Sequence, residues 1–92
     1  MILRFDHKGL ERFFRDGDTR GVNAQFAPKL RLLLGMLNDA RRPEDMNLPG
    51  ARLHPLKGKR KGQWAVSISG NWRLVFAFDG ENATSLDLVD YH

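Results

Sequence analysis

Apolar residues recur at helical spacing in the first half of the chain. Leu10, Phe13 and Phe14 fall on one face of a helix. Gly17 is a typical helix terminator, so this helix should span residues 7–16.

The residues before this helix predict a short opening strand. It is suggested by Ile2, Arg4 and Phe5 and ends at Asp6. Asp6 is the expected N-cap, because a side-chain oxygen there accepts hydrogen bonds from the free amides of the first turn.

A second helix is predicted by a stripe of apolar residues at spacings of three, four and seven: Phe26, Leu30, Leu33, Leu34 and Leu37. Pro28 would break a hydrogen bond if this helix began as early as Asn23. The helix therefore either begins near Ala27 or is kinked. Residues 41–43 mark its end, and residues 43–50 are expected to be irregular.

In the second half of the chain, apolar residues alternate with polar or small ones, which is typical of strands. Three strands are indicated by their alternating apolar residues: Trp64, Val66 and Ile68; Trp72, Leu74, Phe76 and Phe78; Leu86 and Leu88. Gly70-Asn71 and Asp79-Gly80 are typical of tight hairpin turns. Two helices packed on an antiparallel meander give an α+β fold, which we expect to form one domain over residues 1–92.

Composition narrows the class of protein. The chain has 92 residues and no cysteine, so packing must hold it together and it needs no oxidising compartment. Met1-Ile2-Leu3 is followed at once by Arg4, and no apolar run reaches the ~20 residues of a membrane helix. We therefore expect a cytoplasmic protein with no signal peptide and no membrane contact.

Charge is distributed unevenly. The net charge is +4 and the pI is near 10.0, which favours polyanionic partners. No acidic residue lies between Met46 and Phe78, a stretch that holds Arg52, Lys57, Lys59, Arg60, Lys61 and Arg73. Basic loops are often merely solvated, but the nearby aromatic and histidine residues favour RNA as the partner.

Two candidate catalytic residues lie within this basic stretch. Pro55 restricts the backbone at His54, and Gly58 permits a sharp turn at Lys57. A histidine and a lysine are thereby expected near one another on one bend.

Strand alternation directs Arg73 away from the predicted core, where its planar guanidinium could bind a phosphate. The alternative is a surface ion pair with Asp87. Trp64 and Trp72 share the opposite, core-facing side, so we expect both to be core residues rather than platforms for base stacking.

The chain ends on an acid, a phenol and an imidazole: Asp90-Tyr91-His92. An imidazole can donate or accept a proton near neutral pH. Tyr91 could stack on a base, take part in proton transfer, or be an ordinary aromatic on an edge strand. His7, His54 and His92 lack metal-ligand spacing, so we expect neither a metal nor another cofactor.

Together these residues resemble the HigB toxins of the wider RelE/ParE superfamily. The resemblance spans essentially the whole chain and rests on the segments Phe5–Leu10, Leu53–Gly58, Arg60, Gly62, Trp64, Asn71–Arg73, Phe76 and Asp90–His92. It implies a microbial-ribonuclease-like (RelE-like) fold and a toxin that cleaves messenger RNA on the ribosome without a metal. In that reaction the RNA 2′-hydroxyl attacks the adjacent phosphate, so one proton must be removed, another delivered and the phosphorane stabilised.

The resemblance also implies roles for individual residues. Arg73 and Lys57 would neutralise the scissile phosphate. His54 and His92 would be the leading acid and base candidates, in an order that stays open.

Six further residues belong to this implied site or its surroundings. Asp90 would orient a neighbour or act as base, and Tyr91 would stack on or position the flipped base. Asn71 would orient the phosphate or simply complete its turn. The loop Lys59-Arg60-Lys61 would grip ribosomal RNA.

The implied partners are a cognate helix-turn-helix antitoxin (HigA-like) and the ribosome with messenger RNA in its A site. Operator DNA would be reached only through the antitoxin complex. Three alternatives stay open: a non-catalytic module that binds RNA or the ribosome, a ParE-like toxin that inhibits DNA gyrase, and a ribonuclease that needs no ribosome.

Overall fold

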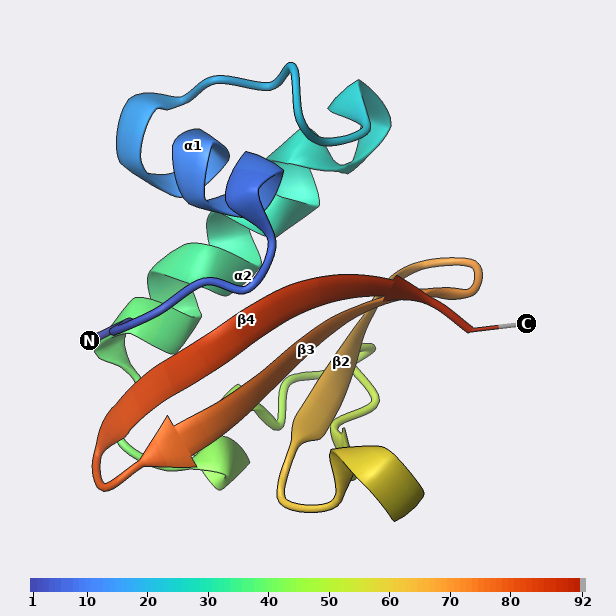
Figure 1. Ribbon diagram of the computed structural model, residues 1–92. Coiled ribbons are helices and arrows are strands. Elements are labelled where there is room, and N and C mark those ends of the chain that lie inside the picture. Colours follow the sequence, from blue (N-terminus) through green and yellow to red (C-terminus); the bar gives the residue numbers. More distant parts are fainter. Residues whose placement is uncertain (92) are drawn as a thin grey trace.

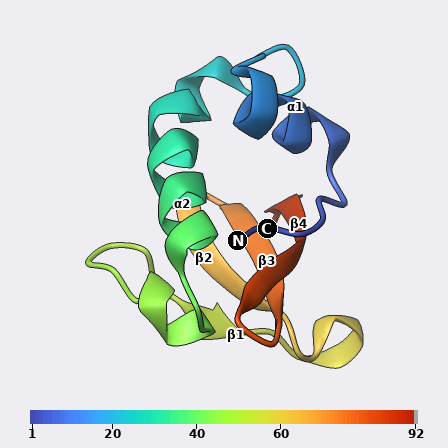
Figure 2. The same ribbon diagram turned by 90° about the vertical axis from the view of Figure 1, so that its left-hand side faces the viewer.

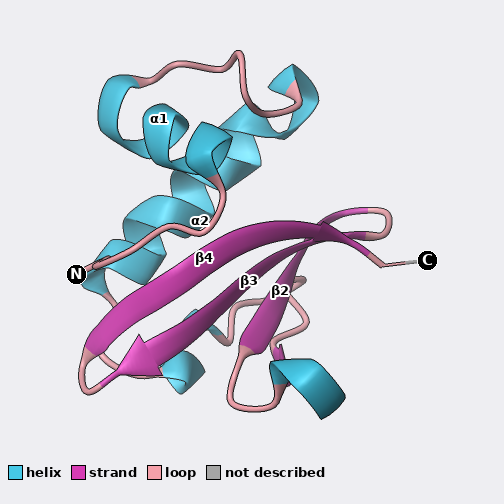
Figure 3. Cartoon of the chain, in the orientation of Figure 1, coloured by secondary structure: helices cyan, strands magenta, loops and turns pink. Residues whose placement is uncertain are grey.

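The computed structural model describes residues 1–91, and helices and strands form two layers there (Figure 1, Figure 3). One layer holds α1 (Lys8–Asp16) and α2 (Ala27–Asp39). The other is an antiparallel sheet in the order β1-β2-β3-β4, made of β1 (His54–Pro55), β2 (Trp64–Ser69), β3 (Trp72–Asp79) and β4 (Asn82–Asp90). The connections contain the short 3₁₀ helices η1 (Ala24–Phe26), η2 (Pro43–Met46) and η3 (Gly58–Arg60). The predicted α+β class is confirmed.

The predicted N-terminal strand is present as an extended segment that runs alongside β4 (Figure 1). Ile2 and Phe5 form isolated parallel bridges with Ala83 and Leu86. Both apolar side chains are buried, so the segment is held by the core as well as by its backbone.

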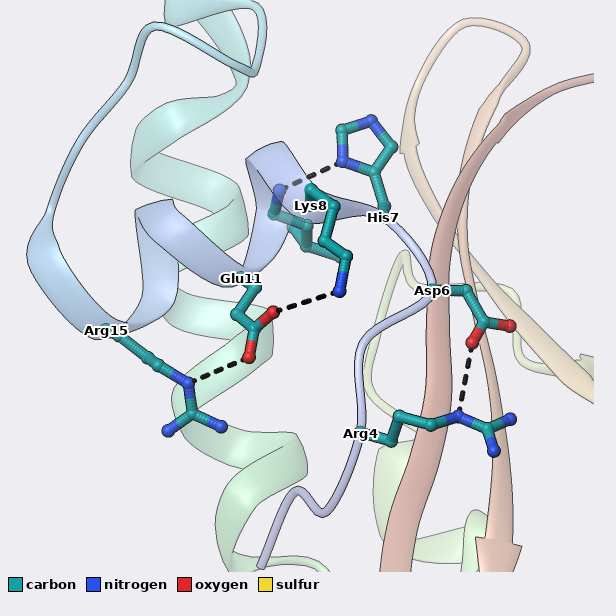
Figure 4. Close-up of polar contacts among 7 residues, drawn as sticks. Arg4, Asp6, His7, Lys8, Glu11 and Arg15 are labelled. Atoms are coloured by element: carbon teal, nitrogen blue, oxygen red, sulfur yellow. Dashed lines mark hydrogen bonds and ion pairs between the residues drawn. The ribbon is translucent and has the colours of Figure 1, made fainter.

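The expectation that Asp6 caps α1 is wrong. His7 is the N-cap, and its Nδ1 accepts a hydrogen bond from the Leu10 amide at 2.9 Å (Figure 4). Asp6 instead pairs with Arg4, with 3.3 Å between Oδ1 and Nε. Since Nδ1 accepts, the neutral His7 ring carries its proton on Nε2.

The start of α2 resolves the question raised by Pro28. The helix begins at Ala27, so Pro28 lies in its first turn, where no intrahelical partner for its missing N–H is required. Before it, η1 is capped by the Asn23 side chain, which accepts a hydrogen bond from the Gln25 amide at 2.9 Å. The helix ends at Asp39, close to the predicted boundary.

The helices cover one side of the sheet, which we call the inner face. The predicted apolar stripe of α2 packs there against residues of β2 and β3: Val66, Ile68, Leu74 and Phe76. Trp64 contacts this core as predicted. Trp72 does not lie within it: the residue is 36% exposed at the rim, with its ring centroid 5.8 Å from that of Phe26.

The opposite side, the outer face, carries a second apolar cluster made of Leu56, Ala65 and Val75. Val89 and Tyr91 pack against its edge. The outer face therefore has its own small core and is not an open polar surface. The connection between β1 and β2 lies at the opposite end of the molecule from α1 in both Figure 1 and Figure 2.

Candidate active site

A first row of side chains crosses the sheet on its outer face. His54 pairs with Ala65, Ala65 with Val75, and Val75 with Asp87. Directly paired residues project to the same side of a sheet, so all of these side chains share one face. Three strand spacings of ~4.8 Å place His54 and Asp87 about 14 Å apart at opposite edges.

The next row holds Arg73, flanked by Ser67 on β2 and Val89 on β4. Tyr91 follows two residues after Val89 and packs against the outer-face cluster. Its backbone N–H donates to the Asn71 carbonyl at 2.8 Å, which ties the chain end to the β2–β3 turn. The fold thus brings Arg73 and Tyr91 to the same end of the outer face.

The Arg73 guanidinium is held against this turn by two backbone carbonyls. Its Nη1 donates to the Gly70 oxygen at 2.8 Å and to the Trp72 oxygen at 3.1 Å. Both bonds use Nη1, whereas Nε and Nη2 supply three further N–H donors suited to an anion. The alternative partner, Asp87, pairs with Arg60.

His54 is oriented by the backbone of Arg52. Its Nδ1 lies 2.9 Å from the Arg52 carbonyl oxygen. A carbonyl only accepts, so Nδ1 carries the proton and the lone pair of the neutral ring lies on Nε2. From strand spacings of ~4.8 Å and a rise of ~3.3 Å per residue, the Cα atoms of His54 and Arg73 are about 12 Å apart.

The β1–β2 loop carries three lysines. Lys57 follows the buried Leu56 directly and is exposed, as are Lys59 and Lys61. No hydrogen bond or ion pair links Lys57 to His54 within residues 1–91, so the predicted bend brings the two close in sequence without joining them. Arg60 is only partly exposed.

The terminal residues separate in space. Asp90 pairs with Trp72, so alternation places it toward the inner face, away from Arg73 and Tyr91. His92 lies outside the described residues. Of the predicted terminal group, Tyr91 is therefore the member that the described structure places beside Arg73.

A hollow of about 340 Å³ lies between the helices, remote from the outer face. Its lining is Phe13, Phe14, Gly17, Arg31, Leu34 and Gly35. The only ionisable side chain in that lining is Arg31, whose guanidinium carbon lies 5.4 Å from the Phe13 ring centroid. Acid–base cleavage needs groups that accept and release protons, so we place the candidate site on the outer face instead.

Within residues 1–91, no group of three or more His, Asp or Glu side chains could hold a metal ion. The helices of this part of the chain are also too short or too polar to cross a bilayer.

Two features of the site could not be predicted from the sequence. The carbonyls of Arg52 and Gly70 orient His54 and Arg73, and backbone acceptors are common to every residue type. The pairing of Asp87 with Arg60 depends on how the loop folds over the sheet.

The chain is similar in sequence to known proteins of one toxin family. Residues 3–92 match the family model described as the RelE-like toxin of the type II toxin–antitoxin system HigB. The chain is 39% identical over 92 residues to Endoribonuclease HigB of Proteus vulgaris, covering 100% of both proteins. It is 31% identical over 78 residues to Toxin HigB-1 of Vibrio cholerae serotype O1, covering 83% of this chain and 82% of that protein. The chain therefore belongs to the HigB-like family of RelE-like toxins.

Proposed function

We propose that this toxin is a ribosome-dependent, metal-independent endoribonuclease that cuts messenger RNA by attack of the 2′-hydroxyl on the adjacent phosphate. The outer face carries the proposal, because it combines an oriented imidazole at His54, a guanidinium at Arg73 and the ring of Tyr91. The name of the relative from Proteus vulgaris, Endoribonuclease HigB, supports the reaction class.

In this mechanism, His54 and His92 divide the proton transfers. One imidazole accepts the 2′-hydroxyl proton, and the other delivers a proton to the leaving 5′-oxygen. For His54 the reacting atom is Nε2, since Nδ1 is engaged by the Arg52 carbonyl. Which imidazole acts as the base and which as the acid depends on the direction in which the RNA crosses the outer face.

Arg73 stabilises the phosphorane through its Nε and Nη2 donors while Nη1 stays on the turn. Lys57 adds a second cation from the loop. Tyr91 stacks on a base at the same end of the face. Asp90, which projects to the other side of β4, orients a neighbouring side chain rather than the substrate, and Asn71 supports the turn through its carbonyl.

The basic loop would contact ribosomal RNA while messenger RNA occupies the A site. A site with so few groups benefits from a substrate that the ribosome has already positioned. We place this action in the cytoplasm, where ribosomes work. Since type II systems pair a toxin with a protein antitoxin, we further propose a HigA-like helix-turn-helix partner, through which the complex would reach operator DNA.

The test is cleavage of a defined messenger RNA on purified ribosomes, beside the same RNA free in solution. Arg73→Ala should lower the rate constant by roughly 10²–10³-fold, the usual cost of losing one preorganised donor for developing charge. Arg73→Lys is the matched control: it keeps the charge but loses the planar fork, so it should recover only part of the rate. Circular dichroism and thermal unfolding check that each variant folds.

Cleavage by Arg73→Ala at the wild-type rate would remove Arg73 from the mechanism. Efficient cutting of free RNA would favour the ribosome-independent ribonuclease. No cleavage by folded wild-type protein in either setting would discard the nuclease reading and favour passive RNA binding or gyrase inhibition.

A further inference from the structure

Arg60 differs from the lysines on either side of it. Its Nη2 lies 3.6 Å from Asp87 Oδ2, and its Nη1 donates to Gln63 Oε1 at 3.1 Å. Its side chain is 36% exposed, and that of Asp87 is 28% exposed. Lys59 and Lys61 are exposed. Within the loop, the arginine is therefore partly buried and bonded to protein partners, whereas the two lysines beside it are exposed to solvent.

The two members of this pair come from distant parts of the sheet. Arg60 belongs to the connection between β1 and β2, whereas Asp87 lies on β4, at the far end of the row that begins with His54. Asp87 is itself oriented, because its Oδ1 accepts a hydrogen bond from the Leu88 amide at 2.9 Å. The loop must therefore fold back across the outer face for Arg60 to reach its partner.

An apolar contact fixes the other end of the loop. Leu56 is 9% exposed and packs on Ala65 and Val75, and its amide donates to the Gln63 carbonyl at 2.9 Å. Lys57 lies between this anchor and Arg60. Two anchors on the sheet thus limit the movement of the loop segment that carries Lys57.

We propose that Arg60 and Asp87 are positioning residues, which hold the β1–β2 loop over the outer face so that Lys57 reaches the phosphate bound by Arg73. This role rests on the proposed ribonuclease function. It assigns Arg60 to the architecture of the site, while Lys59 and Lys61 supply the ribosome contacts.

Asp87→Asn removes the charge and keeps the size of the side chain. We expect kcat for cleavage on ribosomes to fall roughly 10- to 100-fold, because small misplacements of a positioned group are costly. Asp87→Arg, which places two cations together, should lose more. Combining it with Arg60→Asp reverses the pair and should recover most of kcat over either single change.

Asp45→Asn is the matched control. Asp45 forms a comparable ion pair with Arg42, with 3.4 Å between Oδ1 and Nε, on η2, whose Met46 packs in the core beneath the inner face. It should leave kcat unchanged. Lys59→Ala should raise KM and reduce the salt dependence of ribosome binding, with little change in kcat.

A second readout does not depend on activity. Limited trypsin digestion should cut the β1–β2 loop several-fold faster in Asp87→Asn than in wild type or in Asp45→Asn, since release of the loop exposes its backbone. If wild type cleaves no RNA, the proposed function fails, and this digestion still decides whether the pair holds the loop. Wild-type kcat and wild-type digestion in Asp87→Asn would overturn the proposal, as would a folded charge-reversal double variant no more active than its single variants.

Discussion

Replacement of His7 by Ala should destabilise the protein by removing the N-cap of α1. His7 Nδ1 is the acceptor for the Leu10 amide at 2.9 Å (Figure 4), and loss of an N-cap side chain typically costs about 1 kcal/mol. For a domain of this size that corresponds to a fall in Tm of about 4–8 °C.

His7→Asn separates the cap from the ring. An asparagine oxygen can accept the same hydrogen bond but lacks the imidazole, so most of the lost stability should return. Asp6→Ala tests the residue that the sequence predicted as the N-cap of α1. It removes only an exposed ion pair with Arg4, which is worth at most a few tenths of a kcal/mol here, and leaves the Asp6 amide bonded to the Leu86 carbonyl.

The assay is thermal unfolding followed by far-ultraviolet circular dichroism at pH 7.5. The order expected for Tm is wild type and Asp6→Ala together, His7→Asn slightly lower, and His7→Ala lowest. If Asp6→Ala falls as far as His7→Ala, or if His7→Asn recovers nothing, the capping argument is refuted. Cleavage per folded molecule should be unchanged, since α1 lies at the other end of the molecule from the β1–β2 loop (Figure 1).

Two further stability predictions concern the rest of the helical layer. Gly9→Ala should destabilise the protein by about 1–3 kcal/mol in urea unfolding, because the added Cβ would lie 2.4 Å from the Gly21 carbonyl oxygen. Gly35→Ala should instead stabilise α2 by about 1 kcal/mol, because the added Cβ would meet nothing within 4 Å beyond the neighbouring backbone of its own helix. Equal effects of the two substitutions would contradict this reasoning. The hydrogen bond from the Arg20 side chain, helped by the Arg20 backbone amide, lowers the pKa of Asp18 from 3.8 to about 2. A depressed carboxyl pKa contributes stability that is present above about pH 4 and is lost as pH falls toward 2. Asp18→Asn should therefore be less stable than wild type at pH 7, and this difference should shrink between pH 4 and pH 2 and in high salt. A difference that stays constant from pH 7 to pH 2 would argue against the pairing.

Much of the fold followed from local patterns. Gly17 ends α1 because a left-handed residue is needed there, and its φ is 72°. The α2 stripe is buried because its spacing matches one helical face, as Leu30 and Leu37 at 0% exposure illustrate. Gly70-Asn71 lies between β2 and β3 as predicted, whereas the β3–β4 turn is Gly80-Glu81, because Asp79 still pairs with Asn82 as the last residue of β3.

Two sequence predictions were wrong, for the helix cap and for Trp72, because each depended on contacts between distant segments. Asp6 and His7 can both cap a helix, and the backbone pairing of the first residues with β4 decided between them. Trp72 lies on the core-facing side of its strand, yet it is at the strand end, where the helices no longer cover the sheet completely.

The class of fold, the basic stretch and the residue types of the candidate site could be predicted from the sequence, because helix and strand periods, turn chemistry and charge are local properties. Which of these residues share a face depended on how the strands pair in the folded protein. Register placed His54, Arg73 and Tyr91 on the outer face and turned Asp90 away, and the folding of the loop chose Asp87 as the partner of Arg60. The physical reason is that a strand reverses its facing at every residue, so the composition of a site depends on pairings between segments that lie far apart in the chain.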